Sequence, residues 1–311
     1  MGFDLDALRC AIERHGHVAR VVIADVKGSS PREVGASMLV WAGGQSGTIG
    51  GGALEFELSK RALGVQEKAL TRHALGPQLG QCCGGALQIV TEVFDAVNLP
   101  QTEDDIVARC VVGTKGTPLK VKRILADARS QGITPHAQLC EGWFIEPIAR
   151  PTRPLWIWGA GHVGRAIVST LAPLPEFAIT WIDTSDARFP ESSSENVTKL
   201  SAANPALLAR HAPLNAEHLI LTYSHALDLK LCHQLLIHSF AFTGLIGSKS
   251  KWARFRNRLA ALGHTNEQIL RITCPIGDPH LGKHPQAIAI SVASRLLMNA
   301  KSLAQTQRTT A

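Results

Sequence analysis

Residues 155–164 read Leu155-Trp156-Ile157-Trp158-Gly159-Ala160-Gly161-His162-Val163-Gly164. A short apolar run leads into a G-x-G-x-x-G motif, and a helix-like segment follows it to about Leu171. A lone motif of this kind is a weak signal. Here it lies between a predicted strand and a predicted helix, and Asp183 ends the next predicted strand about 20 residues further on. The stretch therefore predicts a βαβ unit with a glycine-rich loop at its first turn.

Each part of this motif has a physical role in binding a nucleotide. Gly159 allows a tight turn, Gly161 lets a pyrophosphate approach the backbone, and Gly164 lets the helix lie close to the strand. The helix N-terminus offers unpaired N–H groups to an anion. Asp183 is expected to hydrogen-bond ribose hydroxyls and to disfavour a 2′-phosphate, which makes a dinucleotide such as NAD the expected ligand. The alternative is a retained fold in which the glycines serve only packing.

Strand-like and helix-like patterns alternate through the rest of the second half. Apolar runs at 178–182, 219–222 and 242–246 predict strands, and 228–239 predicts a helix between the last two. Such alternation implies a parallel sheet with helices on both faces. Residues 151–311 are therefore expected to form a Rossmann-like, doubly wound parallel sheet.

Two further loops in this half carry polar candidates. His225 follows a predicted strand, where a histidine can act as a proton carrier in a dehydrogenase, and an ordinary loop histidine is the alternative. Ser248 and Lys249 begin a basic helix and are candidates for holding an anion, with a solvated helical face as the alternative. The chain has no Tyr-x-x-x-Lys proton relay, which counts against an oxidoreductase.

The composition changes at residues 146–154, where Pro147, Pro151 and Pro154 interrupt regular structure. We place a domain boundary there, after a first domain of residues 1–150. This domain is expected to be mixed α/β. Its predicted helices cover 5–15 and 53–69, and its predicted strands cover 18–26, 37–41, 87–94, 107–112 and 119–125.

The most unusual stretch of the first domain is a loop at 75–85, which reads LGPQLGQCCGG. Four glycines and a proline surround two adjacent thiols, Cys82 and Cys83. Adjacent cysteines rarely form a disulfide, because the ring is strained. A soft thiolate suits a soft metal or a sulfur-transfer step. The alternative is a pair of buried, small apolar side chains.

A second glycine-rich loop, at 47–52, precedes a predicted helix. The run Gly50-Gly51-Gly52 is expected to contact an anion through its main-chain N–H groups. Arg32, in the loop before it, is a candidate for a bidentate grip on a phosphate. A simple turn and helix entry is the alternative.

Composition excludes several classes of protein. The chain has 311 residues and a formal net charge of +7, which fits a small anionic ligand. No apolar run approaches the roughly 18 residues that span a bilayer, so no membrane association is expected. No basic stripe with interleaved aromatic residues indicates nucleic-acid binding. Seven cysteines, an odd number, argue against a disulfide scaffold and favour a reducing cytoplasm.

Taken in this order, the motifs resemble the XdhC/CoxI family, the accessory proteins of xanthine dehydrogenase and related molybdenum hydroxylases. In the first domain the resemblance rests on the segments 28–36, 47–55 and 79–85. In the second it rests on 159–164, 225–228, 247–249 and 275–277. One departure concerns an arginine that family members often carry shortly after the acidic residue of the second Rossmann strand. Here Thr184 and Ser185 follow Asp183, and Arg188 comes only later.

The resemblance implies a chaperone for the molybdenum cofactor, a pterin dithiolene with a phosphate, rather than a turnover enzyme. Such a protein holds the cofactor while a cysteine desulfurase supplies sulfur, and then passes it to the molybdenum subunit of xanthine dehydrogenase. Cys82 and Cys83 are the expected metal contacts. The expected cofactor-binding residues are Arg32, Gly50, Gly51, Gly52, Gln81, Cys82, Cys83, Gly84, Gly159, Gly161, Gly164, Asp183, His225, Ser248 and Lys249.

Two other functions stay open at this point. An NAD-dependent oxidoreductase would use Asp183 and His225 in the second domain. A thiol redox sensor would use the adjacent cysteines. A homodimer is expected on general grounds, because two-fold assemblies are the commonest.

Overall fold

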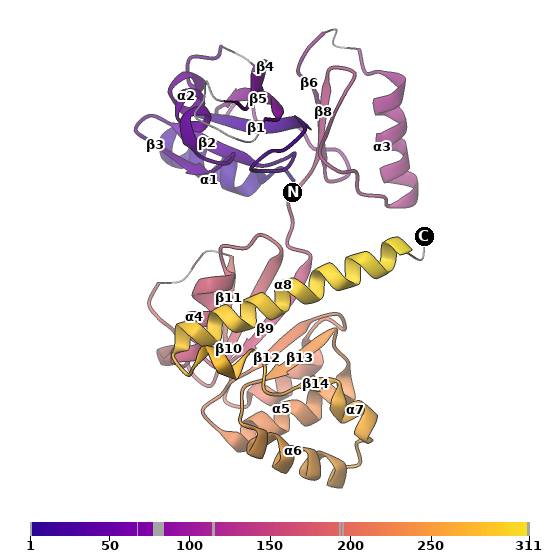
Figure 1. Ribbon diagram of the computed structural model, residues 1–311. Helices are drawn as coiled ribbons and strands as arrows, with labels where there is room; N and C mark the ends of the chain where they lie inside the picture. The colour runs from indigo at the N-terminus through magenta and orange to yellow at the C-terminus, as the bar shows by residue number, and fades with distance from the viewer. Residues whose placement is uncertain are drawn as a thin grey trace. The chain divides into compact units, whose positions relative to one another are not determined.

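A computed structural model describes residues 2–66, 68–76, 84–113, 116–192, 194 and 196–309. The chain divides into two compact units, Met1–Arg150 and Pro151–Ala311 (Figure 1). The proline-rich segment around this division is shorter than the sequence indicates. Pro147 ends a strand of the first unit, and Pro154 lies inside the first strand of the second.

An antiparallel sheet of five strands forms the body of the first unit, in the order β3-β2-β1-β5-β4. Its strands are β1 (Val18–Lys27), β2 (Ser37–Trp41), β3 (Gly44–Gly47), β4 (Lys68–Ala74) and β5 (Ala86–Phe94). Helix α1 (Leu5–His15) and helix α2 (Gly52–Ala62) bury their apolar side chains in the cores beside this sheet. The expected helix at 53–69 is therefore too long, because β4 begins at Lys68. The residues of β4 are mostly exposed or half-buried, so apolar and polar residues do not alternate clearly along this strand.

A second sheet in this unit has the order β6-β8-β7 and consists of β6 (Ile106–Cys110), β7 (Gln138–Cys140) and β8 (Trp143–Pro147). The strand expected at 119–125 is wrong, since this segment begins helix α3 (Leu119–Gln131). Ile124, Leu125 and Ala128 lie three, four and seven residues after Val121, which is a helical spacing, and all four face one apolar core.

Buried charges join the two sheets of the first unit. Arg20 on β1 donates to both carboxylate oxygens of Glu146 on β8, at 2.9 and 2.7 Å. Arg109 on β6 bridges Glu146 and Glu92. These side chains are almost fully buried, so the pairs satisfy each other in the interior.

The second unit contains a parallel sheet in the order β11-β10-β9-β12-β13-β14. Its strands are β9 (Arg153–Trp158), β10 (Phe177–Asp183), β11 (Val197–Ser201), β12 (Glu217–Ile220), β13 (Phe242–Leu245) and β14 (Ile272–Thr273). Numbered from β9, this is the order 3-2-1-4-5-6 of a Rossmann fold. The doubly wound parallel sheet expected from the sequence is thus confirmed.

Helices cover both faces of this sheet. Leu155 and Ile157 of β9 pack with α4 (His162–Leu171) and α8 (Pro285–Thr309). Trp156 and Trp158 point to the other face. There they meet the core built by α5 (His225–His238), α6 (Lys249–Ala261) and α7 (Asn266–Leu270). This alternation follows from the two-residue period of a strand that is buried on both faces.

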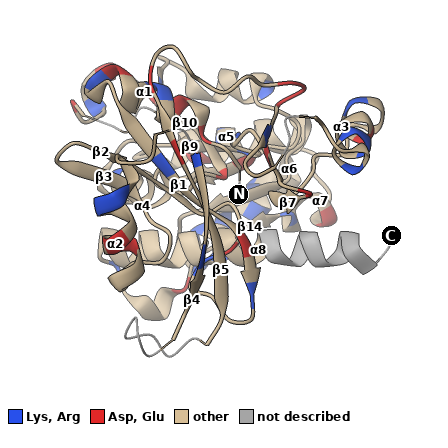
Figure 2. Ribbon diagram, turned by 90° about the horizontal axis from the view of Figure 1, so that it is seen from above, with Lys and Arg blue, Asp and Glu red and all other residues tan. Residues whose placement is uncertain are grey.

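No helix in the described part of the chain is both long enough and apolar enough to cross a membrane. Figure 2 shows basic and acidic residues interspersed along the helices and strands rather than gathered in one stripe.

Candidate functional site

The order of the parallel strands reverses between β9 and β12, and loops at the carboxyl ends of these strands meet there. Ligands of open α/β sheets bind at such a switch point. Gly159 has φ +122°, and a Cβ on it would lie 2.5 Å from the carbonyl oxygen of Leu221. A Cβ on Gly164 would overlap the carbonyl oxygen of Gly159. Both positions therefore need glycine for the fold itself.

Gly161 differs from these two glycines. Its φ is −74°, and a Cβ there would meet no atom within 4 Å. It precedes α4 directly, so the open space lies beside the N-terminus of a ten-residue helix. This is the one glycine of the motif that the described fold does not require, and the space beside it suits a ligand.

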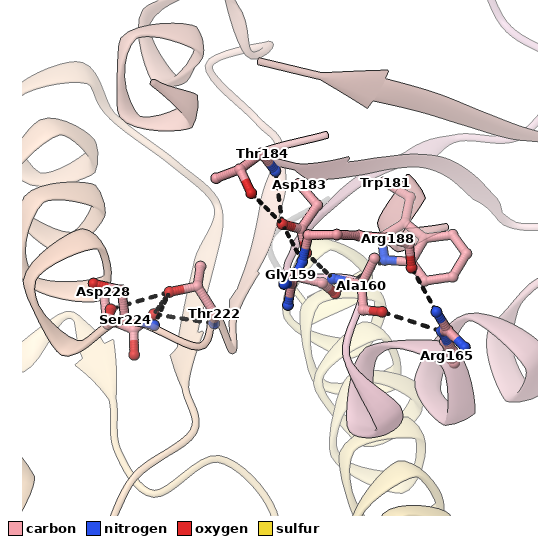
Figure 3. Close-up of polar contacts among 10 residues, drawn as sticks. All are labelled: Gly159, Ala160, Arg165, Trp181, Asp183, Thr184, Arg188, Thr222, Ser224 and Asp228. Carbon is pink, nitrogen blue, oxygen red and sulfur yellow. Dashed lines mark hydrogen bonds and ion pairs between the residues drawn. The ribbon is translucent and has the colours of Figure 1, made fainter. Parts of the chain in front are cut away.

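The carboxylate of Asp183 contacts two backbone N–H groups and an arginine of the same chain (Figure 3). Its Oδ2 accepts a hydrogen bond from Ala160 N at 2.5 Å, and its Oδ1 accepts from Thr184 N at 2.6 Å. The Nε of Arg188 lies 2.7 Å from Oδ1. Burial alone would raise the pKa of Asp183, but these hydrogen bonds and the ion pair hold it below its ordinary value.

In the described structure the carboxylate of Asp183 is engaged by groups of its own chain, and its expected contact with a ribose stays a prediction. The residue is only 4% exposed, and both of its oxygens already have donors, so the carboxylate is not presented to a ribose. Arg188, which comes later in the sequence than the arginine of family members, nevertheless lies beside Asp183. A short 3-10 helix, Asp186–Arg188, returns the arginine to Asp183.

Two arginines lie beside the Gly159–Gly164 loop. Arg165 donates from Nε to Ala160 O at 3.2 Å and from Nη2 to Arg188 O at 2.7 Å. The guanidinium of Arg188 lies over the ring of Tyr223, 4.6 Å from its centroid. Tyr223 follows β12, so this stacking contact spans the switch point between the two halves of the sheet.

A buried ion pair positions the next two loops. Asp228 on α5 accepts from Thr222 N at 3.1 Å and from Thr222 Oγ1 at 2.7 Å. Its Oδ2 lies 2.6 Å from the Nζ of Lys251 on α6, which also donates to Ile246 O at 2.9 Å. His225 is exposed at the start of α5, next to this network.

A cavity of about 450 Å³ lies beyond the carboxyl ends of β13 and β14. Ser248 and Lys249 line it, together with apolar residues that include Ile246 and Ile276. Cys274, just before the cavity wall, is half-buried, and burial with the nearby Asp228 raises its pKa to about 11. Burial thus disfavours the thiolate form of Cys274.

Three loops meet in the first unit. Ser29 forms an isolated parallel bridge with Gly84, and a Cβ on Gly28 would lie 3.3 Å from Gly85 Cα. A Cβ on Gly50 would lie 2.7 Å from the Cγ of Pro31. A cavity of about 460 Å³ opens beside these loops, lined by Val26, Gly28, Ser30, Pro31, Arg32, Glu33 and Val34. The predicted residues Arg32, Gly50 and Gly84 thus lie in neighbouring loops.

Two of the main-chain N–H groups before α2 donate to a carboxylate of the chain itself. The Oε2 of Glu55 accepts from Ile49 N at 3.0 Å, from Gly51 N at 2.9 Å and from Thr48 Oγ1 at 2.6 Å. Gly50 N donates to Thr48 Oγ1 at 3.0 Å. In the described structure the N–H of Gly51 therefore binds a carboxylate of the chain and that of Gly50 binds a hydroxyl, and the anion contact expected of both stays a prediction.

Three predicted residues, Gln81, Cys82 and Cys83, lie outside the described residues. Within the described ranges, no group of three or more His, Cys, Asp or Glu side chains could hold a metal ion. Sequence reasoning assigned no role to Glu55 or Tyr223, and it grouped Lys251 with Lys249 as a candidate for an anion, whereas Lys251 pairs with Asp228. One feature of the sequence could have indicated that Glu55 binds these N–H groups. It lies in the first turn of α2, where an acidic side chain interacts with the free N–H groups of a helix start.

Comparisons with known proteins cover both units. Residues 155–296 match the model of the XdhC Rossmann domain, and residues 11–74 match that of the XdhC and CoxI family. The chain is 26% identical over 294 residues to the uncharacterized protein YqeB of Escherichia coli K12, which covers 92% of this chain. The chain spans only 44% of the length of that relative.

A solved structure from Bacillus halodurans, described as a xanthine dehydrogenase, is similar over 97% of this chain and 96% of its own. The TM-score is 0.69 and the sequence identity is 21%. At that identity the similarity shows a shared fold over nearly the whole chain.

Proposed function

The chain belongs to the XdhC and CoxI family, and from this membership we propose that it is a chaperone for the molybdenum cofactor of a xanthine dehydrogenase or a related hydroxylase. The cofactor is its cargo. The chain holds it while a cysteine desulfurase supplies sulfur, and then delivers it to the molybdenum subunit of the target enzyme.

One observation carries the proposal, namely the bridge between Ser29 and Gly84 beside the cavity of the first unit. Gly84 follows Cys82 and Cys83 directly in the sequence. Arg32 lines the cavity that opens next to the bridged loop. Arg32 therefore lies near the residue that follows the two cysteines in the sequence, and a guanidinium together with thiols suits a ligand that carries both a phosphate and a soft metal.

In this proposal different residues bind different parts of the cargo. The anion contact falls to the side chain of Arg32, since the N–H groups of Ile49 and Gly51 already bind Glu55. The thiols of Cys82 and Cys83 are the donors for molybdenum, because sulfur ligands suit soft transition metals. Gly85 packs against the backbone of Ser29 and keeps the end of the cysteine loop at the cavity.

Co-purification tests the proposal. The full chain is expressed with a source of the cofactor, and molybdenum and pterin are measured per chain after purification. We expect Arg32→Ala, Cys82→Ala and Cys83→Ala to lower both contents. Arg9→Ala is the matched control, because Arg9 is an exposed arginine of the same unit that pairs only with Asp6 in the described contacts. Contents near zero in the wild-type chain, or contents unchanged in all three variants, would contradict the proposal.

A further inference from the structure

We propose that the parallel-sheet unit binds a nucleotide that carries a 2′-phosphate, and that Arg188 selects it over a nucleotide with a free ribose diol. This inference concerns the second unit alone. It does not rest on the cargo function proposed for the first unit.

The first step is the state of Asp183. In a Rossmann fold the acidic residue at the end of the second strand binds the ribose hydroxyls as an acceptor. Here Ala160 N occupies Oδ2, while Thr184 N, Thr184 Oγ1 and Arg188 Nε surround Oδ1. Since a carboxylate has about four acceptor positions and this one is 4% exposed, a ribose diol finds no accessible partner there.

The second step is the side chain of Arg188, which is available to a ligand where Asp183 is not. The side chain of Arg188 is 35% exposed and covers the carboxylate of Asp183. A guanidinium has five N–H donors, and Asp183 engages it through Nε. Among the described residues, its two terminal nitrogens have no hydrogen-bond partner, so they remain as donors for an anion.

The third step is the rigidity of that guanidinium. Asp183 holds one edge of it, and the ring of Tyr223 supports its face at 4.6 Å. Arg165 fixes the backbone of Arg188 through a hydrogen bond of 2.7 Å to its carbonyl oxygen. A planar guanidinium held in this way is preorganised for a bidentate contact with a phosphate.

The fourth step is position. An arginine near the end of the second Rossmann strand accommodates the 2′-phosphate of NADP. The open space at Gly161 lies on the neighbouring loop, at the N-terminus of α4, where a pyrophosphate is expected. Arg188 and Gly161 therefore flank Asp183 as two phosphate positions of one ligand, and the chemistry selects a 2′-phosphorylated dinucleotide.

Isothermal titration of the full chain with NADP⁺ and with NAD⁺ tests the inference. We expect NADP⁺ to bind at least about tenfold more tightly, as charge-assisted bidentate contacts imply. Arg188→Gln should remove most of this preference, and Arg188→Lys should keep part of it. Arg210→Gln is the matched control, because Arg210 is an exposed arginine of the same unit whose described side-chain contact is with the adjacent His211.

Four results would overturn the inference. These are equal or tighter binding of NAD⁺, no binding of either nucleotide, an unchanged preference in a folded Arg188→Gln variant, and binding of inorganic phosphate as tight as that of NADP⁺. Circular dichroism of each variant shows whether it is folded. The comparison of the two nucleotides in the wild-type chain decides the case even if a variant does not fold.

Discussion

Ser29 and Gly84 pair across an isolated parallel β-bridge, although 54 residues separate them along the chain. The bridge fixes the loop that leads to Arg32 beside the residue that follows Cys83. It lies beside the point where β4 ends and β5 begins, and there Leu75 N donates to Gly85 O at 2.7 Å. The proposed cargo site depends on this contact.

Gly85→Ala tests that contact. A Cβ at Gly85 would overlap Ser29 O and lie 2.9 Å from Lys27 O, so the bridge must open. We expect a loss of about 1–3 kcal/mol in the free energy of unfolding, measured with urea, together with a lower molybdenum content. Gly76→Ala is the control, because a Cβ there meets nothing within 4 Å. A Gly85→Ala chain with unchanged stability and cargo would show that the close approach is unimportant.

Glu55→Gln tests the internal anion before α2. Burial alone would raise the pKa of Glu55, but hydrogen bonds from Thr48, Gly51, Ile49 and Gln45 lower it below its ordinary 4.5. A folded-state pKa below the unfolded one gives stability that is present above pH 4.5 and is lost as the pH falls through the folded value.

The urea midpoint of wild type should therefore exceed that of Glu55→Gln near pH 7, and the difference should shrink in acid. Glu57→Gln, which removes an exposed partner of Arg61, serves as the control for surface charge. A difference that does not depend on pH would show that ionised Glu55 does not stabilise the loop.

Two glycines of the second unit have different expected roles, since Gly164 is needed for the fold and Gly161 for binding a ligand. Gly164→Ala should lower the free energy of unfolding by about 1–3 kcal/mol, because its Cβ overlaps the carbonyl oxygen of Gly159. Gly161→Ala should leave stability nearly unchanged, since nothing lies within 4 Å, but should weaken nucleotide binding. Urea unfolding and nucleotide titration measure the two effects. Unchanged nucleotide binding in Gly161→Ala would place the ligand elsewhere.

Asp228→Asn tests the buried pair that holds the loops after β12 and β13. Asparagine still accepts from Thr222 but leaves the ammonium of Lys251 without its carboxylate. Because Asp228 is fully buried, we expect a loss of about 3 kcal/mol in unfolding free energy. The exposed Asp186→Asn is the control. Equal stability of both variants in urea would mean that the pair is not stabilising.

The sequence predicts the parallel sheet well because the motif at 155–164 joins a buried strand, a turn and a helix within ten residues. It does not distinguish helix from strand at 119–125, where the spacing of Leu119 and Val121 fits a strand and that of Val121, Ile124 and Leu125 fits a helix. Only the helical spacing of apolar residues, which continues to Ala128, favours the helix over the strand.

The contacts of the candidate site are less predictable than the fold. Glycines before a helix predict an anion, but the sequence does not say whether the anion is a ligand or Glu55. Likewise, an acid at the end of a second strand predicts ribose binding, whereas Arg188 occupies that acid from five residues away. Both outcomes depend on side-chain contacts that a motif does not encode.

Direct loading of the purified chain tests the central claim. The metal-free chain is mixed without oxygen with molybdenum cofactor released from another protein, and unbound cofactor is removed by gel filtration. We predict that wild type retains molybdenum and pterin in near-equal molar amounts, and that the Cys82→Ala/Cys83→Ala double variant retains far less. Passage of all the cofactor in the unbound fraction, or equal retention by the two chains, would contradict the claim.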